Sequence, residues 1–504
     1  MAMQQALISL DIGSSGARAS AFDCDGRLVA DARRGYPTDY PHEGWAQQDA
    51  RRWFSASIEV LSRMCQRLRP RGWQVLGLAL TGQCPTYVPV DDQMQPIGPA
   101  LTYQDNRAVE QAQELECRFG AATIHERCGH SPQAFYILPK VLWQKEHDER
   151  LFRQIRWVLQ PSDYLAYRLT GQLATSTTHA SGTLAYDIRT RVWSAEFVAA
   201  AGLDSGVFPR LVLDPWSVVG ELRDDIATQT GLPRGLPIVI GAPDSQCCSL
   251  GVGAIEPGQL SNMSGTSTCL NGTVPRPIDD LGVGNYYHVV KHLYSAEVGL
   301  NTTGAALGWI GGIVLPHVPE KQRYEVLETT ARRSCLGARG VTFVPYLTGG
   351  ERDSQTVKGG FHNLSMATTS GDLVRAVLEG VAFAERERIE LLDKAGCQFT
   401  EMYLSGGGAR LDFWNQMKAD VTGLPVHAVS TVDAAELGAA MLAGIGVGVY
   451  EDAWQAVQAC RPVSREYTPN SHRALEYDKR YRAFVDLEAV LATDGAQASG
   501  AMRK

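Results

Sequence analysis

The segment that begins at Asp11 has the residue types that can bind phosphate and a metal ion. The apolar run 7–10 predicts a buried strand that ends on Asp11, and the small residues Gly-Ser-Ser-Gly follow at 13–16. At the tip of a hairpin such residues let backbone N–H groups and hydroxyls approach phosphate oxygens, because no large side chain stands in the way. Asp11 would then face a metal ion carried by the phosphates. An ordinary hairpin with an acid at its corner is the alternative.

A second acid, Asp244, stands in a similar place on the other half of the chain. Residues 237–240 predict another buried strand, and Asp244 precedes small residues that open a helix. A single acid in such a place is usually a turn or helix-capping residue. Farther on, Gly265, Thr266 and Ser267 form a second tip of small residues. Two such tips indicate a duplicated structural unit.

The elements that must position these residues are strands that lead into helices. Apolar spacing predicts helices near residues 51–67 and 370–395, and strands at 75–80, 87–91 and 402–405. The last of these strands runs into three consecutive glycines at 406–408. A helix of small residues is expected at 433–444, and beyond residue 450 the chain predicts a polar helical extension.

Length and composition exclude several classes of protein. A chain of 504 residues is too long for one core and predicts two domains. The net charge is -8 and no run of basic residues occurs, so nucleic acid is not an expected partner. No apolar stretch is long enough to span a bilayer and the N-terminus lacks the pattern of a signal peptide, so a cytoplasmic protein is expected. The 11 cysteines include no Cys-x-x-Cys pair, which favours buried thiols over redox chemistry.

The order of these motifs resembles a known family. The segment from Asp11 to Arg18 resembles the first phosphate loop of the sugar kinase, Hsp70 and actin superfamily, and the later motifs resemble the FGGY carbohydrate kinases, with the xylulokinase members closest in wording. The resemblance runs from residue 7 to about residue 446. It implies an α/β protein of two ribonuclease-H-like domains, hinged across a cleft for ATP and sugar. Residues 1–247 would form the sugar-binding domain and residues 248–504 the nucleotide-binding domain, with the helical extension from about residue 451.

The resemblance also implies roles for individual residues. Asp244 would be the general base, and Asp11 would face Mg²⁺ on the phosphates of ATP. The remaining nucleotide contacts would come from the glycine-rich and hydroxyl-rich segments of both halves: Gly13, Ser14, Ser15, Arg18, Gly265, Thr266, Ser267, Gly304, Gly308, Gly407, Gly408, Ala409 and Asn415.

The expected sugar-binding residues depart from the family pattern. Gln83 matches the start of the family's sugar loop, but Cys84 and Pro85 stand where methionine and histidine are expected. Proline has no backbone N–H and no side-chain donor, so the identity of the sugar is left open. Asp105 and Arg107 are candidates for sugar hydroxyls, together with Asp244 and Ser245, although a surface ion pair would also explain the first two. The segment 345–352 resembles the family's Pro-Tyr-Leu-x-Gly-Glu-Arg, with an additional glycine.

The implied function is ATP-dependent phosphorylation of a hydroxyl of a small ketose. D-xylulose, converted to D-xylulose 5-phosphate, is the first choice. Another pentulose, a hexulose or a polyol, such as ribulose or erythritol, is the alternative. A non-catalytic actin-like or Hsp70-like ATPase is the alternative from another class; it would need the two hairpin tips but not Gln83, Asp105 or Arg107. The expected cofactors are ATP and Mg²⁺. No membrane partner is expected, and a homodimer is left open.

Overall fold

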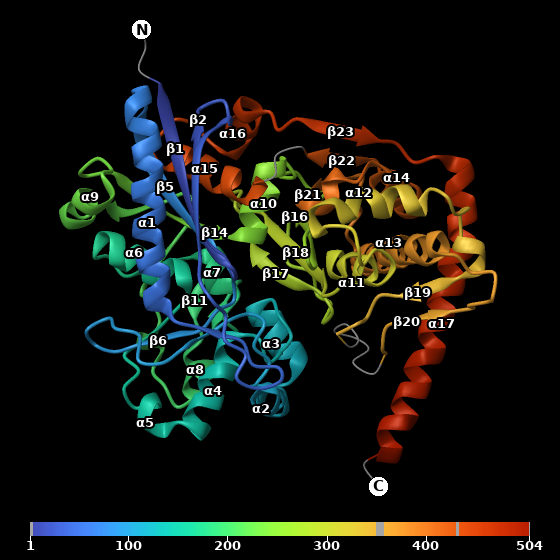
Figure 1. Cartoon of the computed structure of the whole chain (residues 1–504). Coiled ribbons are helices and arrows are strands. Elements are labelled where there is room, and N and C mark those ends of the chain that lie inside the picture. The colour runs from blue at the N-terminus through green and yellow to red at the C-terminus, as the bar shows by residue number, and fades with distance from the viewer. Residues whose placement is uncertain (1–3, 349–356, 430–432, 503–504) are drawn as a thin grey trace. The chain divides into compact units, whose positions relative to one another are not determined.

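The computed structural model describes residues 4–348, 357–429 and 433–502 (Figure 1). The predicted segment at residues 349–352 therefore lies outside the described residues. The chain divides into two compact units. The first unit combines Met1–Ile255, Thr273–Ala296 and Asp433–Pro462, and the second combines Glu256–Gly272, Glu297–Val432 and Val463–Lys504. Each unit is built on a mixed sheet with helices, which confirms the predicted two-domain α/β fold. The predicted boundary after residue 247 stays a prediction.

The first unit contains a six-stranded sheet with the order β13-β14-β5-β1-β2-β3. β1 pairs antiparallel with β2 and parallel with β5, and β5 pairs parallel with β14. β13 closes this end antiparallel to β14. The strands are β1 (Gln5–Ile12), β2 (Gly16–Asp23), β3 (Leu28–Gly35), β5 (Gln74–Gly82), β13 (Val218–Glu221) and β14 (Pro237–Pro243).

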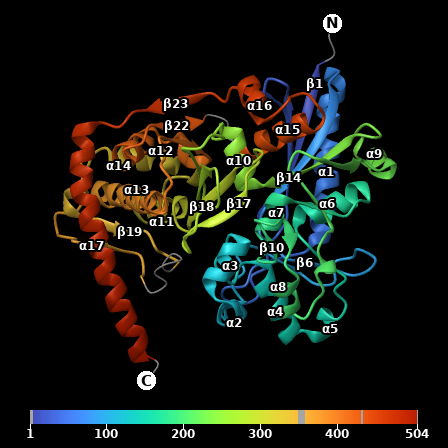
Figure 2. The ribbon, with the colours of Figure 1, turned by 180° about the vertical axis from the view of Figure 1, so that it is seen from behind.

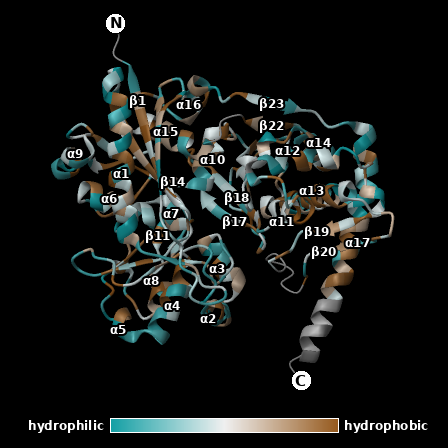
Figure 3. Ribbon diagram, viewed as in Figure 1, coloured by the Kyte–Doolittle hydropathy of each residue, from teal (hydrophilic) through white to brown (hydrophobic). Residues whose placement is uncertain are grey.

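Two helices cover opposite faces of this sheet. Successive residues of a strand point to opposite faces. Ile8 and Leu10 of β1 belong to the core under α1 (Ala50–Leu68), whereas Leu7 belongs to the core under α15 (Ala434–Gly446). Apolar colour follows β1 in Figure 3. The helices predicted at 51–67 and 433–444 are thereby confirmed.

The helix that begins with Asp244, α10 (Asp244–Val252), packs closely against α15, and the two helices can be followed from behind in Figure 2. A Cβ on Gly438 would lie 1.8 Å from the carbonyl oxygen of Cys247, and a Cβ on Gly251 would lie 1.8 Å from that of Ala434. Only glycine allows this backbone contact. This close packing of α10 and α15 places the start of α15, near residue 434, beside α10, which follows β14 directly.

The rest of the first unit is formed mainly by short elements. They are β4 (Gln47–Gln48), β6 (Val88–Val90), β7 (Ala100–Leu101), β8 (Trp157–Leu159), β9 (Ala174–Ser176), β10 (Tyr186–Asp187), β11 (Val192–Trp193), β12 (Leu211–Leu213), β17 (Gly284–Tyr287), α2 (Val109–Phe119), α3 (Ala121–Cys128), α4 (Ile137–His147), α5 (Glu149–Phe152), α6 (Pro161–Thr170), α7 (Thr177–Ser181), α8 (Ala195–Ala200), α9 (Asp224–Thr230) and α16 (Ala453–Cys460).

The second unit contains the part β16-β15-β21-β22-β23 of a seven-stranded sheet. β15 (Gln259–Ser264) pairs antiparallel with β16 (Thr268–Val274) and parallel with β21 (Glu401–Ser405). β21 pairs parallel with β22 (Val426–Val429), and β23 (Ser464–Tyr467) closes this end antiparallel. These pairings repeat those of β2-β1-β5-β14-β13, as expected for a duplicated unit.

The remaining elements of the second unit surround this sheet. They are α11 (Gly304–Val314), α12 (Glu320–Ala331), α13 (Ser370–Lys394), α14 (Asp412–Thr422), α17 (Ser471–Met502), β18 (Tyr294–Leu300), whose first residues are counted with the first unit, β19 (Thr342–Val344) and β20 (Gly360–His362). α13 confirms the helix predicted from residue 370. β23 is a strand inside the segment predicted as a helical extension, because pairing with the edge of β22 overrides the local pattern.

Candidate active site

Three predicted site residues lie at one edge of the first sheet. In the parallel register, Ile12 of β1 and Pro243 of β14 are both opposite Gly82 of β5. Asp11, Gln83 and Asp244 therefore lie at the carboxyl ends of three adjacent strands. Neighbouring strands are about 4.8 Å apart, so β1 and β14 are separated by about 10 Å across β5. Ligands of open α/β sheets bind at such carboxyl ends.

The first glycine–serine tip is held from behind by side chains. Gly13 N–H donates to Gly16 O at 3.1 Å and closes the turn. The Tyr36 hydroxyl donates to Gly13 O at 2.7 Å, and the Thr38 hydroxyl donates to Ser14 O at 3.0 Å. These bonds draw the carbonyl oxygens of the turn toward the protein. An anion could then meet N–H groups and hydroxyls at the tip rather than carbonyl oxygens.

Asp11 has the environment of a cation ligand. Its Oδ1 is buried and has no hydrogen-bond partner among the described residues. Burial, followed by the charges of Glu436 and Asp244, raises the pKa of the Asp11 carboxyl well above its usual range. A buried acceptor beside other carboxylates fits a divalent cation. Within residues 4–348, 357–429 and 433–502, no three His, Cys, Asp or Glu side chains gather into a metal site, so other ligands would have to come from phosphates and water.

Arg18, predicted to contact ATP, is engaged by two carboxylates at the start of α15. It donates to Glu436 Oε1 at 2.7 Å and to both carboxylate oxygens of Asp433. Arg33 also donates to Asp433, at 3.4 Å. Sequence reasoning missed Asp433 and Glu436 because they lie more than 400 positions from Arg18. In this structure the Arg18 guanidinium balances carboxylates beside Asp11.

Asp244 is the first residue of α10. Its Oδ1 accepts a hydrogen bond from Ser245 N–H at 2.8 Å. The positive end of the helix dipole favours the ionised carboxylate at this position. The negative charge of Asp244 contributes to the raised pKa of Asp11, so the two carboxyl groups are close enough to interact electrostatically. The predicted contact of Ser245 with the sugar stays a prediction.

Tyr103, which stands where the family has tryptophan, belongs to the same neighbourhood. Burial and then the charge of Asp244 raise the pKa of Tyr103. The residue was not among the predicted site residues. Its position two residues before Asp105, a predicted site residue, could have indicated that Tyr103 lies near the site.

The segment that carries Tyr103 is fastened by a buried lysine. Lys140 is fully buried and donates to Thr102 O at 2.7 Å and to Phe135 O at 2.6 Å. Burial lowers the pKa of the Lys140 ammonium to about 7. Lys140 therefore supports the backbone of the segment that carries Tyr103.

The structure places Asp105 and Arg107 in a buried ion pair. Arg107 donates to Asp105 through Nε at 2.9 Å and Nη2 at 2.8 Å, and their side chains are 4% and 0% exposed. Ala46 N–H donates to Asp105 Oδ2 at 2.7 Å, and the guanidinium lies 3.7 Å from the centre of the Trp45 ring. The alternative of a surface ion pair is wrong. These contacts hold the segment 105–107 against Trp45 and Ala46. The predicted contact of Asp105 and Arg107 with sugar stays a prediction.

The predicted sugar loop begins with a buried amide. Gln83 is 2% exposed, and its Nε2 donates to Gln48 Oε1 at 2.8 Å. Cys84 Sγ donates to Gln160 Oε1 at 3.0 Å. Pro85 is the next residue along this loop.

In the second unit, the predicted phosphate tip meets the start of α11. Gly265 N–H donates to Ser267 O at 2.9 Å, and Ala305 N–H donates to Thr266 O at 3.0 Å. A Cβ on Gly304 would lie 2.2 Å from Gly265 O. The structure thereby brings the tip 265–267 and Gly304 together, and their predicted contacts with ATP stay predictions.

The glycine turn after β21 lies against the strand that leads into this tip. A Cβ on Gly408 would lie 2.6 Å from Ser264 Oγ, whereas a Cβ on Gly407 would meet open space. Asn415 is fully buried, and its Nδ2 donates to Ala409 O at 2.8 Å. Asn415 therefore braces the turn 407–409, and its predicted contact with adenosine stays a prediction.

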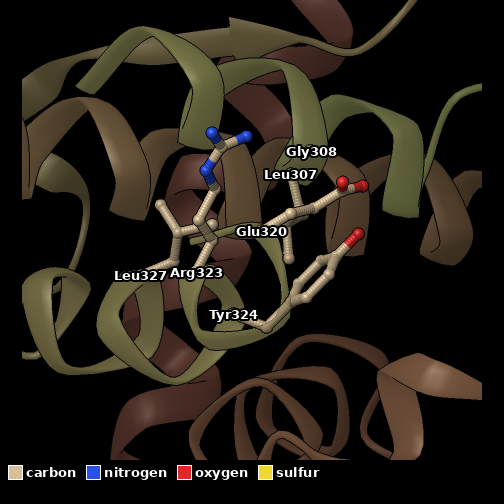
Figure 4. A pocket seen from close by; sticks show the side chains of 6 residues that line it. All are labelled: Leu307, Gly308, Glu320, Arg323, Tyr324 and Leu327. Atoms are coloured by element: carbon tan, nitrogen blue, oxygen red, sulfur yellow. The ribbon is translucent and has the colours of Figure 1, made fainter. Parts of the chain in front are cut away.

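A pocket of about 130 Å³ lies beside α11 and α12. Figure 4 shows the Tyr324 ring and the leucines along its wall, with the carboxylate of Glu320 and the Tyr324 hydroxyl on one side. Gly308, predicted to contact ATP, forms part of the lining and leaves the pocket open. The lining residues are Leu307, Gly308, Glu320, Arg323, Tyr324 and Leu327.

Comparison with known proteins agrees with this fold. Residues 6–251 match the N-terminal domain of the FGGY family of carbohydrate kinases, and residues 260–447 match its C-terminal domain. The chain belongs to the FGGY family of carbohydrate kinases. It is an ATP-dependent sugar kinase, as the sequence predicted.

Individual relatives cover nearly the whole chain at modest identity. A xylulose kinase of Bacillus subtilis is 27% identical over 487 residues, 95% of each chain. A glycerol kinase of Gloeobacter violaceus is 28% identical over 482 residues, 92% of this chain and 93% of the relative. The crystal structure of xylulose kinase from Rhodospirillum rubrum is 29% identical, covers 97% of this chain and 100% of its own, and superposes with a TM-score of 0.90. Among the helices that the structure describes, none is both long and apolar enough to cross a membrane.

Proposed function

We propose that this kinase transfers the γ-phosphoryl group of ATP to a hydroxyl of a small ketose, with D-xylulose as the substrate and D-xylulose 5-phosphate as the product. The observation that carries the proposal is the common sheet edge of Asp11, Gln83 and Asp244. A cation ligand, a sugar-loop residue and a candidate base on three adjacent strands suit a reaction between a hydroxyl and a metal-bound phosphate.

In the proposed mechanism Asp244 is the general base. Its carboxylate accepts the proton of the attacking hydroxyl while the oxygen–phosphorus bond to the sugar forms and the bond to the ADP leaving group breaks. The turns 13–15 and 265–267 would supply N–H and hydroxyl donors to the phosphates. Asp11 would hold Mg²⁺, which offsets charge on the transferring group when bound. Gly304, Gly308 and the turn 407–409 would surround the rest of the nucleotide.

Two observations support xylulose as the substrate. Several relatives are xylulose kinases, and the motifs expected to bind sugar resemble those of xylulokinases in their residues. The glycerol kinase is 28% identical to this chain and the xylulose kinase of Bacillus subtilis is 27% identical. Overall sequence identity therefore does not distinguish between the two substrates. Pro85 replaces a histidine that would donate a hydrogen bond, and Tyr103 replaces a tryptophan beside Asp244. Ribulose, another ketose or a polyol such as erythritol is therefore the alternative substrate.

The test is a screen of ADP release with the purified protein over pentuloses, hexuloses and polyols, each with and without Mg²⁺. The proposal expects the highest kcat/KM with D-xylulose and a requirement for the divalent cation. Faster turnover of another sugar would replace xylulose by that sugar. ATP hydrolysis that no sugar accelerates would favour the non-catalytic ATPase. The expected cytoplasmic location and a homodimer stay predictions.

A further inference from the structure

A buried glutamine outside the predicted site connects the phosphate turn with the sugar loop. Gln48 lies in β4 and is 1% exposed. Its Nε2 donates to Ser14 O at 2.7 Å and to Thr38 Oγ1 at 2.7 Å. Its Oε1 accepts from Gln83 Nε2 at 2.8 Å and from Trp53 Nε1 at 3.0 Å. Both donors and both acceptor positions of the amide are used.

The orientation of this amide is determined by its neighbours. The indole N–H of Trp53 can only donate, so the atom that faces it must be the oxygen of Gln48. The amide nitrogen must then face Ser14 O, which can only accept. No flipped arrangement preserves these bonds.

We infer that Gln48 is a positioning residue that holds the phosphate turn 13–16 and the sugar loop at Gln83 in one arrangement. Ser14 lies in the turn that would bind phosphate, and Gln83 opens the loop that would bind sugar, so the inference rests on the proposed function for its catalytic consequence. An error of about 1 Å between reacting groups lowers a rate by about 100-fold. One amide bonded to both segments limits such an error.

The inference has a structural readout that requires no substrate. The amide of Gly13 donates to Gly16 O within the turn, and the amide of Gln83 donates to Ile12 O. Local opening of either segment frees these N–H groups to exchange with solvent deuterium. If Gln48 holds both segments, its removal accelerates exchange in both.

The experiment measures hydrogen–deuterium exchange by mass spectrometry on Gln48→Met, Gln48→Glu and Trp53→Phe. Trp193→Phe is the control for the loss of an indole N–H. Trp193 Nε1 donates one partly buried hydrogen bond, at 2.8 Å to Pro209 O, and neither residue belongs to the two segments. For Gln48→Met we expect at least tenfold faster exchange in peptides covering 12–16 and 82–86, and wild-type exchange there in the control.

Gln48→Glu separates the two connections. Its carboxylate still accepts from Trp53 and Gln83 but turns an oxygen toward Ser14 O, so exchange should rise more at 12–16 than at 82–86. Trp53→Phe removes the N–H that orients the amide while keeping an aromatic ring in the core, and it carries the test if the Gln48 variants fail to fold. In the ADP-release assay, folded variants should lose at least tenfold in kcat with less than threefold change in either KM.

Wild-type exchange at both segments in folded Gln48→Met would overturn the inference. So would a uniform rise along α1 with a loss of kcat that follows the loss of folded protein, because that is the signature of a purely structural residue. A wild-type protein without sugar kinase activity would reject the proposed function, and the exchange data would still decide the role of Gln48.

Discussion

Nζ of Lys418 lies 2.8 Å from Oε1 of Glu385, and both side chains are fully buried in the second unit. Lys418 also donates to Ser264 Oγ at 3.4 Å, and the Thr268 hydroxyl donates to Glu385 Oε1 at 3.5 Å. Ser264 and Thr268 flank the turn 265–267. The ion pair therefore supports both sides of the proposed phosphate turn.

Loss of one partner of this pair should strongly destabilise the protein. Lys418→Met leaves the Glu385 carboxylate buried without its cation, and Glu385→Gln leaves the ammonium without its anion. Each is expected to lower the free energy of unfolding by about 3–5 kcal/mol, and the double variant by less than the sum. Urea unfolding of all three variants checks this. Lys479→Met is the control, because the Lys479–Glu476 pair has a similar 2.7 Å separation on an exposed part of α17 and should hardly move the midpoint.

Asp244→Asn should abolish most phosphoryl transfer without loss of the fold. An amide cannot accept the proton of the attacking hydroxyl, and general bases typically contribute about 10²–10⁴-fold in rate. We expect kcat to fall by at least about 100-fold, with the melting temperature and ATP affinity nearly unchanged. Asp224→Asn is the matched control, since Asp224 is likewise the first residue of its helix, α9. Nearly normal turnover by folded Asp244→Asn would reject the mechanism.

Pro85→His should change the choice of sugar. A histidine adds a hydrogen-bond donor to the sugar loop beside Gln83, and one net hydrogen bond is worth about 1 kcal/mol, or about fivefold in relative kcat/KM. The measurement compares kcat/KM for D-xylulose, ribulose and erythritol in both proteins, with KM for ATP as the internal control. An unchanged ranking in a folded variant would show that this loop does not select the sugar.

Gly308→Leu should weaken use of ATP by filling the pocket beside α11. A Cβ at Gly308 would lie 3.8 Å from the Tyr324 hydroxyl, an ordinary contact, so the helix tolerates the change while the longer side chain occupies the cavity. KM for ATP should rise at least tenfold, with little change in KM for sugar. Gly312→Leu, one turn farther along α11, has nothing within 4 Å of its Cβ and should leave both constants unchanged. Equal effects of the two variants would assign the pocket no role in nucleotide binding.

Rising pH, up to about 8, should weaken the attachment of α17 to α13. Burial and then the charge of Glu387 raise the pKa of Glu488 to about 8, with Tyr346 and Arg388 as the other charged or titratable neighbours. The folded pKa lies above the unfolded value of about 4.3, so this stabilisation is complete below about pH 4 and is lost as pH rises through 8.

The midpoint of urea unfolding measured from pH 6 to 9 should fall with pH in the wild type. Glu488→Gln, which stays uncharged, should remove most of that slope. Asp486→Asn, at an exposed carboxyl two residues earlier on α17, should keep it. A wild-type slope in Glu488→Gln would show that other groups cause the pH dependence.

Much of the candidate site was predictable because its determinants are local. An apolar run ends on Asp11 and another ends just before Asp244, and each strand end is defined by its own neighbours in sequence. The turns 13–16 and 265–267 consist of small residues for the same local reason. The ordered family motifs then supplied the fold, which the structure and the family match confirm.

Other features depend on contacts between distant segments. Arg18 on β2 meets Glu436 because α15 packs on the sheet, and Glu385 and Lys418 meet between α13 and α14. Periodicity identifies which face of a helix is buried but not the polar atom that a buried side chain meets. The hydrogen bonds of Gln48 to Gln83 and of Asn415 to Ala409 O are examples, because each joins residues that no local pattern connects. The sequence by itself determined the family, the strand-end acids and the small-residue turns, whereas only the tertiary structure decided which buried polar groups hold those turns in place, because hydrogen-bond partners are selected by proximity in space.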